Sequence, residues 1–231
     1  MVILMKTLPE LLYDIFVEGG AYLTILKGIG VTLEITILSV IFGTILAFGI
    51  CRLRISKKRF VSTLAALYIA ILRGSPVLLV LMIFYYVIFA TSPLSAPMIA
   101  VFAYSTNFSA HVAEIMRTSF QATDKMQNEA ARTLGFSKWQ AFFYITFPQA
   151  VDVALPVYQS AIVTLLQWTS VVGYVTITDL TKVINNITMR TMQPMIMLIT
   201  GVLLYLAIAY IVYGIFAFVE KRRMAGRGGE H

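Results

Sequence analysis

The sequence predicts an all-α integral membrane protein with about five transmembrane helices, its N-terminus outside the cell and its C-terminus in the cytoplasm. Three observations predict this class. Hydrophobic residues fill 59% of the 231 positions and charged residues only 13%, about half the share of roughly 25% in soluble domains. The apolar residues form long runs, and most basic residues lie between those runs. The few charges cannot cover a water-soluble fold, so the composition excludes soluble and disordered classes.

A helix needs ~20 apolar residues to cross a bilayer. Five apolar runs are about that long or longer: residues 28–50, 60–90, 97–116, 150–178 and 194–219. The second run is too long for one straight helix. Because Pro76 lacks a backbone donor and disfavours helical geometry at Ser75, that run is expected to break near 73–76. We expect the whole chain, 1–231, to form a single transmembrane domain in contact with membrane lipid.

Basic residues set the expected orientation, because Lys and Arg collect in cytoplasmic loops. One side carries thirteen of the 18: Arg52, Arg54, Lys57, Lys58, Arg59, Arg117, Lys125, Arg132, Lys138, Lys221, Arg222, Arg223 and Arg227. The other side carries Lys6, Lys27, Lys182 and Arg190, and Arg73 lies within the second run. The net charge of +7 is therefore explained by membrane topology, and no nucleic-acid partner is expected.

The longest expected cytoplasmic loop, residues 117–149, is also the most polar stretch of the chain. Residues 129–134 favour a helix, and Gly135 is well placed as its left-handed cap. Ser137 and Gln140 have the spacing of a capping box that begins a second short helix. The loop is thus predicted to be a helix–glycine–helix hairpin. On the residues alone, it either docks on a partner or lies at the membrane interface without one.

One spaced motif in this loop resembles a known signature. The residues are Glu129, Ala130, Ala131, Gly135, Ile145 and Pro148. They resemble the EAA signature of ATP-binding-cassette (ABC) importer permeases, with Phe147 where that family usually has Leu. The resemblance implies a fold like that of the type I ABC importer permeases. It also implies that Glu129, Ala130, Ala131 and Gly135 belong to coupling helices that dock into a groove of an ATPase subunit.

Two further segments resemble the polar amino-acid permeases of the histidine, arginine, glutamine and glutamate type. They are residues 72–79, with Arg-Gly-Ser-Pro at the centre, and residues 113–117, Ala-Glu-Ile-Met-Arg. The resemblance implies a polar amino acid or a similar zwitterionic or cationic solute. This chain has Gln167-Trp168 where the group usually has Lys-Asp, so no specific solute is predicted.

The resemblance further implies a multi-subunit importer in a bacterial or archaeal cytoplasmic (inner) membrane. Its implied partners are a second permease subunit, identical or homologous, two ATPase subunits that bind ATP and Mg²⁺, and an extracytoplasmic substrate-binding protein.

Polar residues inside apolar runs are candidates for a solute pathway, because such groups are costly in a bilayer. The candidates are Arg73, Ser75, Tyr104, Asn107, Gln167, Trp168, Thr169 and Ser170. The alternatives are interhelical hydrogen bonds for the polar groups and snorkelling or carbonyl capping for Arg73. Glu114 and Arg117, three residues apart on a helix, are expected to form a structural ion pair.

The sequence contains no phosphate-binding loop, no Cys-x-x-Cys pair and no nucleophile elbow. It has one cysteine and two histidines, Cys51, His111 and His231, too few for a metal site built from these residue types. We therefore expect a transport subunit, not an enzyme, with no cofactor of its own. Two other functions stay open at this point: an ion-coupled secondary transporter using His111, Glu114 or Glu34, and a membrane scaffold with no transport role.

Overall fold

The computed structural model describes residues 7–227, which contain helices and no strand; Lys6 and His231 lie outside them. In chain order the elements are α1 (Leu8–Tyr13), η1 (Asp14–Glu18), α2 (Ala21–Arg54), α3 (Arg59–Gly74), α4 (Val77–Ile83), η2 (Phe84–Ile88), α5 (Ala96–Ala122), α6 (Lys125–Thr133), α7 (Lys138–Ala141), η3 (Phe142–Thr146), α8 (Phe147–Trp168), η4 (Thr169–Val175), α9 (Leu180–Thr191) and α10 (Pro194–Arg227). The segments η1, η2 and η3 are π-helical, and η4 is a 3₁₀ helix.

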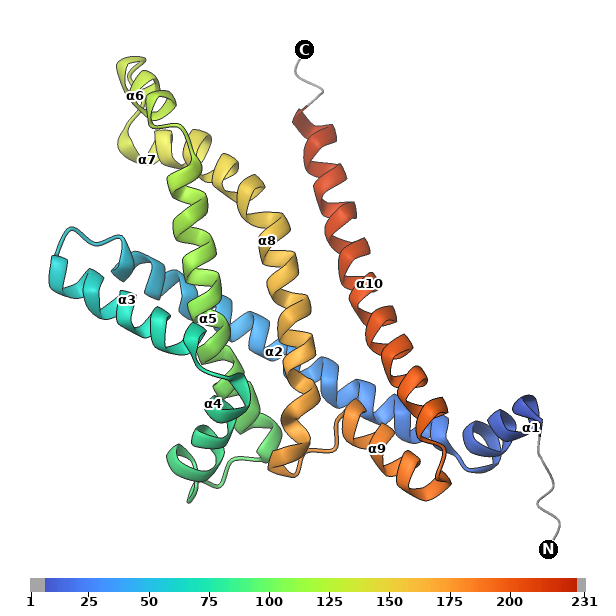
Figure 1. Ribbon diagram of the computed structural model, residues 1–231. Helices are drawn as coiled ribbons and strands as arrows, with labels where there is room; N and C mark the ends of the chain where they lie inside the picture. Colours follow the sequence, from blue (N-terminus) through green and yellow to red (C-terminus); the bar gives the residue numbers. More distant parts are fainter. Residues whose placement is uncertain (1–6, 228–231) are drawn as a thin grey trace, which may run out of the picture.

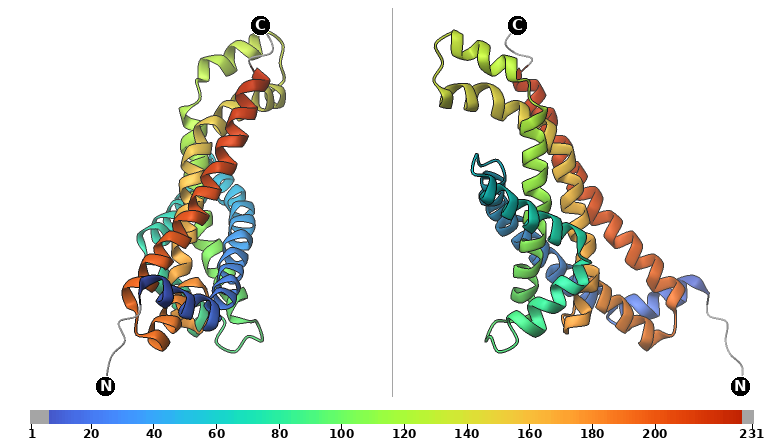
Figure 2. Two further views of the ribbon diagram at one scale, coloured as in Figure 1. Left: turned by 90° about the vertical axis from the view of Figure 1, so that its right-hand side faces the viewer. Right: turned by 60° about the vertical axis from the view of Figure 1, so that its left-hand side comes forward.

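Helix α5 is the centre of the fold. It packs against α2, α3, α4 and α8, most extensively against α2. Figure 1 shows α5 and α8 side by side, with α2 crossing them at an angle and α10 along the outer side of α8. The α6–α7 hairpin lies at one end of the molecule, and α9 and α1 lie at the other. In the views of Figure 2 the hairpin stands out from the helical body.

The tight packing of α2 on α5 depends on Gly43. A Cβ atom there would lie 2.9 Å from the backbone oxygen of Ser105 and 2.9 Å from the ring of Phe108. Any larger residue would force the two helices apart, because neither backbone nor a fully buried ring can yield cheaply. The core beside this contact includes the fully buried Ile35, Tyr104 and Phe108. The absence of a side chain at Gly43 therefore permits this close crossing.

The second apolar run is bent. Helix α3 ends at Gly74, α4 begins at Val77, and the α3 and α4–η2 axes differ by 108°. Ser75 between them is extended, with φ −92° and ψ 138°. Pro76 explains the bend, because it removes a donor and restricts the preceding residue. In contrast, Pro156 lies inside α8 and does not end it.

Three helical stretches are long and apolar enough to cross a membrane by themselves: Ala21–Arg54, Lys138–Val175 and Pro194–Arg223. The bent pair Arg59–Gly74 and Val77–Ile88 would make a fourth span. The expected run at 97–116 lies within α5 but does not meet this criterion, because the polar stretch from Tyr104 to Ser109 lowers its hydropathy. The count of about five spans therefore remains a prediction.

Candidate functional site

The hairpin turn after α6 is a Schellman motif. Phe136 N–H donates to the carbonyl of Ala131 at 3.1 Å, and Gly135 N–H donates to that of Arg132 at 3.1 Å. Gly135 has φ +90°, which is the left-handed conformation expected at this position of the motif. The prediction that Gly135 ends the first helix is confirmed. At the other end of α6, the Asp124 side chain accepts the N–H of Met126 at 2.8 Å.

The second arm begins with the predicted capping box. The Ser137 hydroxyl accepts Gln140 N–H at 3.2 Å, and the Gln140 side chain accepts Ser137 N–H at 2.8 Å. Two side-chain bonds then join the arms, one from Asn128 to Thr146 at 3.0 Å and one between Gln149 and Gln127. The arm continues through η3 into α8 without interruption. The hairpin is thus a braced element attached directly to a long helix.

A hollow lies between the two arms. It is lined by Gln127, Ala130, Ala131, Leu134, Phe136, Tyr144, Ile145, Pro148 and Gln149. Leu134 is 79% exposed, and Tyr144 is 73% exposed. An exposed apolar concavity of this kind fits an interaction site better than a free surface.

The structure brings four of the predicted motif residues to this hollow, namely Ala130, Ala131, Ile145 and Pro148. Gly135 forms the turn beside the hollow. Glu129 is exposed on α6 and does not line the hollow.

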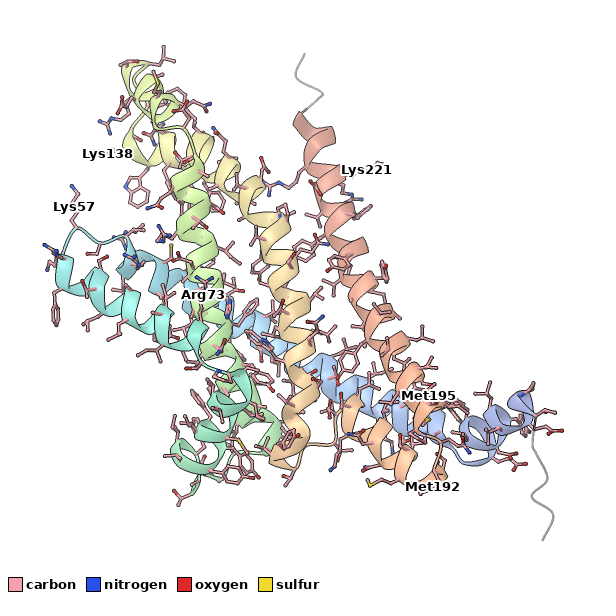
Figure 3. The ribbon with its side chains drawn as sticks, in the orientation of Figure 1. Lys57, Arg73, Lys138, Met192, Met195 and Lys221 are labelled. Atoms are coloured by element: carbon pink, nitrogen blue, oxygen red, sulfur yellow. The ribbon has the colours of Figure 1, made fainter. Side chains whose placement is uncertain are left out.

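Basic side chains mark the hairpin end of the molecule. In Figure 3, Lys57, Lys138 and Lys221 lie toward that end, and Met192 and Met195 lie at the opposite end. These lysines come from three segments that are far apart in the sequence. The fold therefore gathers them at one end, as a single cytoplasmic face requires.

The eight pathway candidates do not share one surface. Tyr104, Asn107 and Thr169 are at most 1% exposed. The Tyr104 hydroxyl donates to the carbonyl of Trp168 at 2.8 Å, and the Asn107 amide donates to that of Leu72 at 3.0 Å. Thr169, the first residue of η4, donates to the carbonyl of Leu166 near the end of α8 at 2.7 Å. The bonds of Tyr104 and Asn107 are interhelical, as in the alternative given from the sequence. The pathway role of these three buried side chains stays a prediction.

The other candidates reach the surface. Arg73 and Gln167 are exposed, and Ser75, Trp168 and Ser170 are half-buried. Figure 3 shows Arg73 beside α5, the helix that carries His111 and Glu114. The ring centroids of Trp168 and His111 are 5.3 Å apart. The hydroxyls of Ser75 and Ser170 donate to the carbonyls of Ile71 and Gln167, each at 2.7 Å.

The predicted ion pair is confirmed. Two nitrogen atoms of Arg117 donate to the two carboxylate oxygens of Glu114, at 2.6 Å and 2.9 Å. Arg117 also donates to Gln121 on the next turn. Among residues 7–227, no group of three His, Cys, Asp or Glu side chains could hold a metal ion.

A buried carboxylate at the start of α9 was not predicted as a site. Asp179 is fully buried and accepts the N–H groups of Thr181 and Lys182, each at 3.0 Å. Burial raises its pKa, and these hydrogen bonds oppose the shift. Thr32 on α2 accepts the N–H of Leu180 at 3.2 Å. An Asp just before an amphipathic helix is an N-cap signal, but nothing local to α2 indicates Thr32.

Comparison with known proteins places the chain in a family. Residues 39–224 match the model of the family described as binding-protein-dependent transport system inner membrane components. The probable amino-acid ABC transporter permease protein YckA of Bacillus subtilis is 34% identical over 199 residues, which cover 86% of this chain and 88% of that protein. The histidine/lysine/arginine/ornithine transport system permease protein HisM of Escherichia coli is 30% identical over 206 residues, or 84% and 87% of the two chains.

Solved structures agree. A crystal structure of an amino acid ABC transporter with histidines matches with a TM-score of 0.80 and 28% identity, covering 90% of this chain and 98% of that chain. The inward-facing MetNI methionine ABC transporter matches with a TM-score of 0.72 and 18% identity, covering 86% and 95%, and this match supports the fold alone. The chain is therefore an all-α ABC transporter permease and belongs to the binding-protein-dependent inner membrane component family.

Proposed function

We propose that this chain works in a bacterial or archaeal cytoplasmic membrane as one permease subunit of a complete importer. A second permease, identical or homologous, pairs with it to line the pathway. Two ATPase subunits dock on the hairpins and bind the ATP and Mg²⁺, so this chain carries no catalytic residue and no cofactor. A substrate-binding protein delivers a polar amino acid or a similar small zwitterionic or cationic solute from outside.

The hollow on the hairpin carries this proposal. Its walls include Leu134 and Tyr144, which are largely exposed, and four residues of the EAA-like motif. Apolar side chains left on the surface in a concave element favour burial against a partner. Because the second arm runs through η3 into α8, a push on the hairpin is carried into the helical body. An ATPase dimer that closes on ATP would use this connection to switch the pathway outward, and hydrolysis would reset it.

The proposed orientation puts the hairpin in the cytoplasm and the α9 end outside. Its support is the gathering of Lys57, Lys138 and Lys221 toward the hairpin end. Helix α1 and the end of α10 also lie at opposite ends of the molecule, as opposite locations of the two termini require.

The amino-acid class is supported by the relatives. The names of these relatives include histidine, lysine, arginine and ornithine for HisM and L-cystine for TcyB of Bacillus subtilis, which is 31% identical to this chain. On this chain, the pathway candidates that reach the surface include the Arg73 cation, the Gln167 amide and the half-buried ring of Trp168. These groups suit a solute carboxylate, a polar group and a cationic or planar part, respectively.

A matched pair of variants tests the docking role. Ala130→Arg places a charged side chain in the hollow, whereas Met126→Arg places the same charge on α6 at a residue that does not line it. We expect Ala130→Arg to reduce copurification of the ATPase at least about tenfold, because a bulky charge in an interface core is excluded and desolvated. Met126→Arg should leave copurification near that of the wild type. Equal recovery with both variants would overturn the docking role.

Uptake into vesicles that contain the full complex tests the energy source. We expect uptake of the solute to require ATP and the binding protein and to survive a protonophore. Uptake that stops with the protonophore and does not require ATP would contradict the proposed energy source.

A further inference from the structure

The bend between α3 and α4 leaves a backbone carbonyl without its helical donor. In an α-helix, the carbonyl of Leu72 would accept the N–H of residue 76. Residue 76 is proline, which has no N–H. Asn107 on α5 supplies the missing donor, with its amide nitrogen 3.0 Å from the Leu72 oxygen. Non-helical backbone at membrane depth needs a partner of this kind.

The second interruption, where α8 passes into η4, has a similar contact. Trp168 is the last residue of α8, and its carbonyl accepts the hydroxyl of Tyr104 at 2.8 Å. Tyr104 is fully buried, so this bond satisfies a hydroxyl that water cannot reach. The ring centroids of Tyr104 and Trp168 are 6.4 Å apart, so the two residues are also packed together.

Tyr104 and Asn107 are three residues apart on α5 and therefore project from neighbouring positions of one helix side. Helix α5 contacts α3, α4 and α8, and in Figure 1 it lies between α3 and α8. One short stretch of α5 thus bonds to the backbone at both interruptions.

Packing alone does not explain Asn107. Its amide oxygen is buried and has no hydrogen-bond partner among the described residues. An unsatisfied buried acceptor lowers stability, whereas the donor side of the same amide satisfies the Leu72 carbonyl. A residue that breaks a local rule in this way is expected where function requires it.

We propose that Tyr104 and Asn107 are positioning residues that make the two helix interruptions move together. The hairpin continues into α8, so its displacement reaches Trp168, crosses to α5 through Tyr104 and reaches the α3–α4 bend through Asn107. The bend carries Arg73, next to Leu72, into or out of the pathway. The expected effect on transport rests on the proposed importer function, whereas the two hydrogen bonds to backbone carbonyls do not depend on it.

A stability cycle tests the carbonyl bond without any transport assay. Asn107→Leu removes the donor at similar volume, and Pro76→Ala restores an N–H four residues after Leu72. We expect Asn107→Leu to lower the melting temperature of the purified protein by several degrees, and by clearly less in the Pro76→Ala background. An equal loss in both backgrounds would overturn the proposed capping of Leu72.

Coupling is measured as solute taken up per ATP hydrolysed by the reconstituted complex. We expect Tyr104→Phe and Asn107→Leu each to lower this ratio about fivefold or more while ATP hydrolysis continues, and the double variant to lose little beyond the worse single variant. Thr106→Val is the matched control, because the Thr106 hydroxyl bonds only within α5, to Phe102. If uptake and hydrolysis fall in equal proportion, the residues are structural and the proposal fails.

The two proposals fail in distinguishable ways. If the wild-type complex shows no ATP-dependent uptake, the importer function is wrong, and the stability cycle still decides the bond between Asn107 and Leu72. If wild-type uptake is normal and the ratio is unchanged in both variants, only the positioning role is overturned.

Discussion

The hairpin and the α5 interior use polar residues in opposite ways. In the hairpin, Ser137 and Gln140 satisfy each other over a few positions of the chain, and apolar side chains such as Leu134 are left exposed. In the interior, the polar side chains of Tyr104 and Asn107 are buried and bond to backbone in other helices. The hairpin is thus built locally for an outside partner, and the interior is built from distant parts for the fold.

This difference shows why residue type alone is a weak guide to a pathway. A polar side chain in an apolar run can face a solute or can satisfy a carbonyl that a bend has freed. Arg73 and Gln167 remain accessible, whereas Asn107 and Thr169 do not. The two roles can be distinguished only by the atom to which each polar group is hydrogen-bonded.

The largest effect is expected in the interior, at Gly43. Gly43→Ala should destabilise the protein by about 1–3 kcal/mol, because the added Cβ would meet the Ser105 backbone at 2.9 Å. Gly49→Ala on the same helix has nothing within 4 Å of its Cβ and should be neutral or slightly stabilising. Chemical unfolding in detergent measures both. If the two variants behave alike, the α2–α5 contact is not as close as described.

In the hairpin, Gly135→Ala should cost about 1–2 kcal/mol, since a left-handed conformation crowds a Cβ atom. The cost should fall on the hairpin, so amide exchange rises in residues 125–141 while the melting temperature changes little. Gly135→Asn should behave more mildly, because Asn tolerates this conformation. A uniform rise of exchange throughout the molecule would show that the hairpin is not an independent local element.

A smaller effect is expected at the cap of α7. Ser137→Ala should destabilise this arm by about 1 kcal/mol through loss of the capping box. Amide exchange at Gln140, whose N–H is bonded to Ser137, is the measurement. Ser137→Asp should restore protection, because Asp is also a good N-cap residue. Unchanged exchange in Ser137→Ala would contradict the role of the cap.

The smallest effect is expected at the ion pair between Arg223 on α10 and Asp152 on α8, which are 3.3 Å apart with about a third of each side chain exposed. Arg223→Gln should cost about 0–1 kcal/mol, the usual range for exposed pairs. The difference from the wild type should vanish in high salt, because ions screen the attraction. A larger, salt-independent loss would mean that this end of α10 is held by packing instead.

Much of the hairpin could be predicted from the sequence. The turn at Gly135 and the capping box at Ser137 depend on backbone geometry within a few residues, so local spacing indicates them. The break at Pro76 could be predicted for the same reason. The burial of Asn107 and Thr169 could not be predicted, because it depends on how α3, α5 and α8 pack.

The sequence by itself determined the membrane class, the hairpin signals and the concentration of basic residues between apolar runs, all of which follow from composition and short-range spacing. Only the tertiary structure decided which distant groups meet: Asn107 with Leu72, 35 residues apart, Tyr104 with Trp168, 64 apart, and Leu180 with Thr32, 148 apart. The physical reason is that a buried polar group must find a partner wherever helix packing places one. That placement depends on close contacts such as the one at Gly43, which no local pattern specifies.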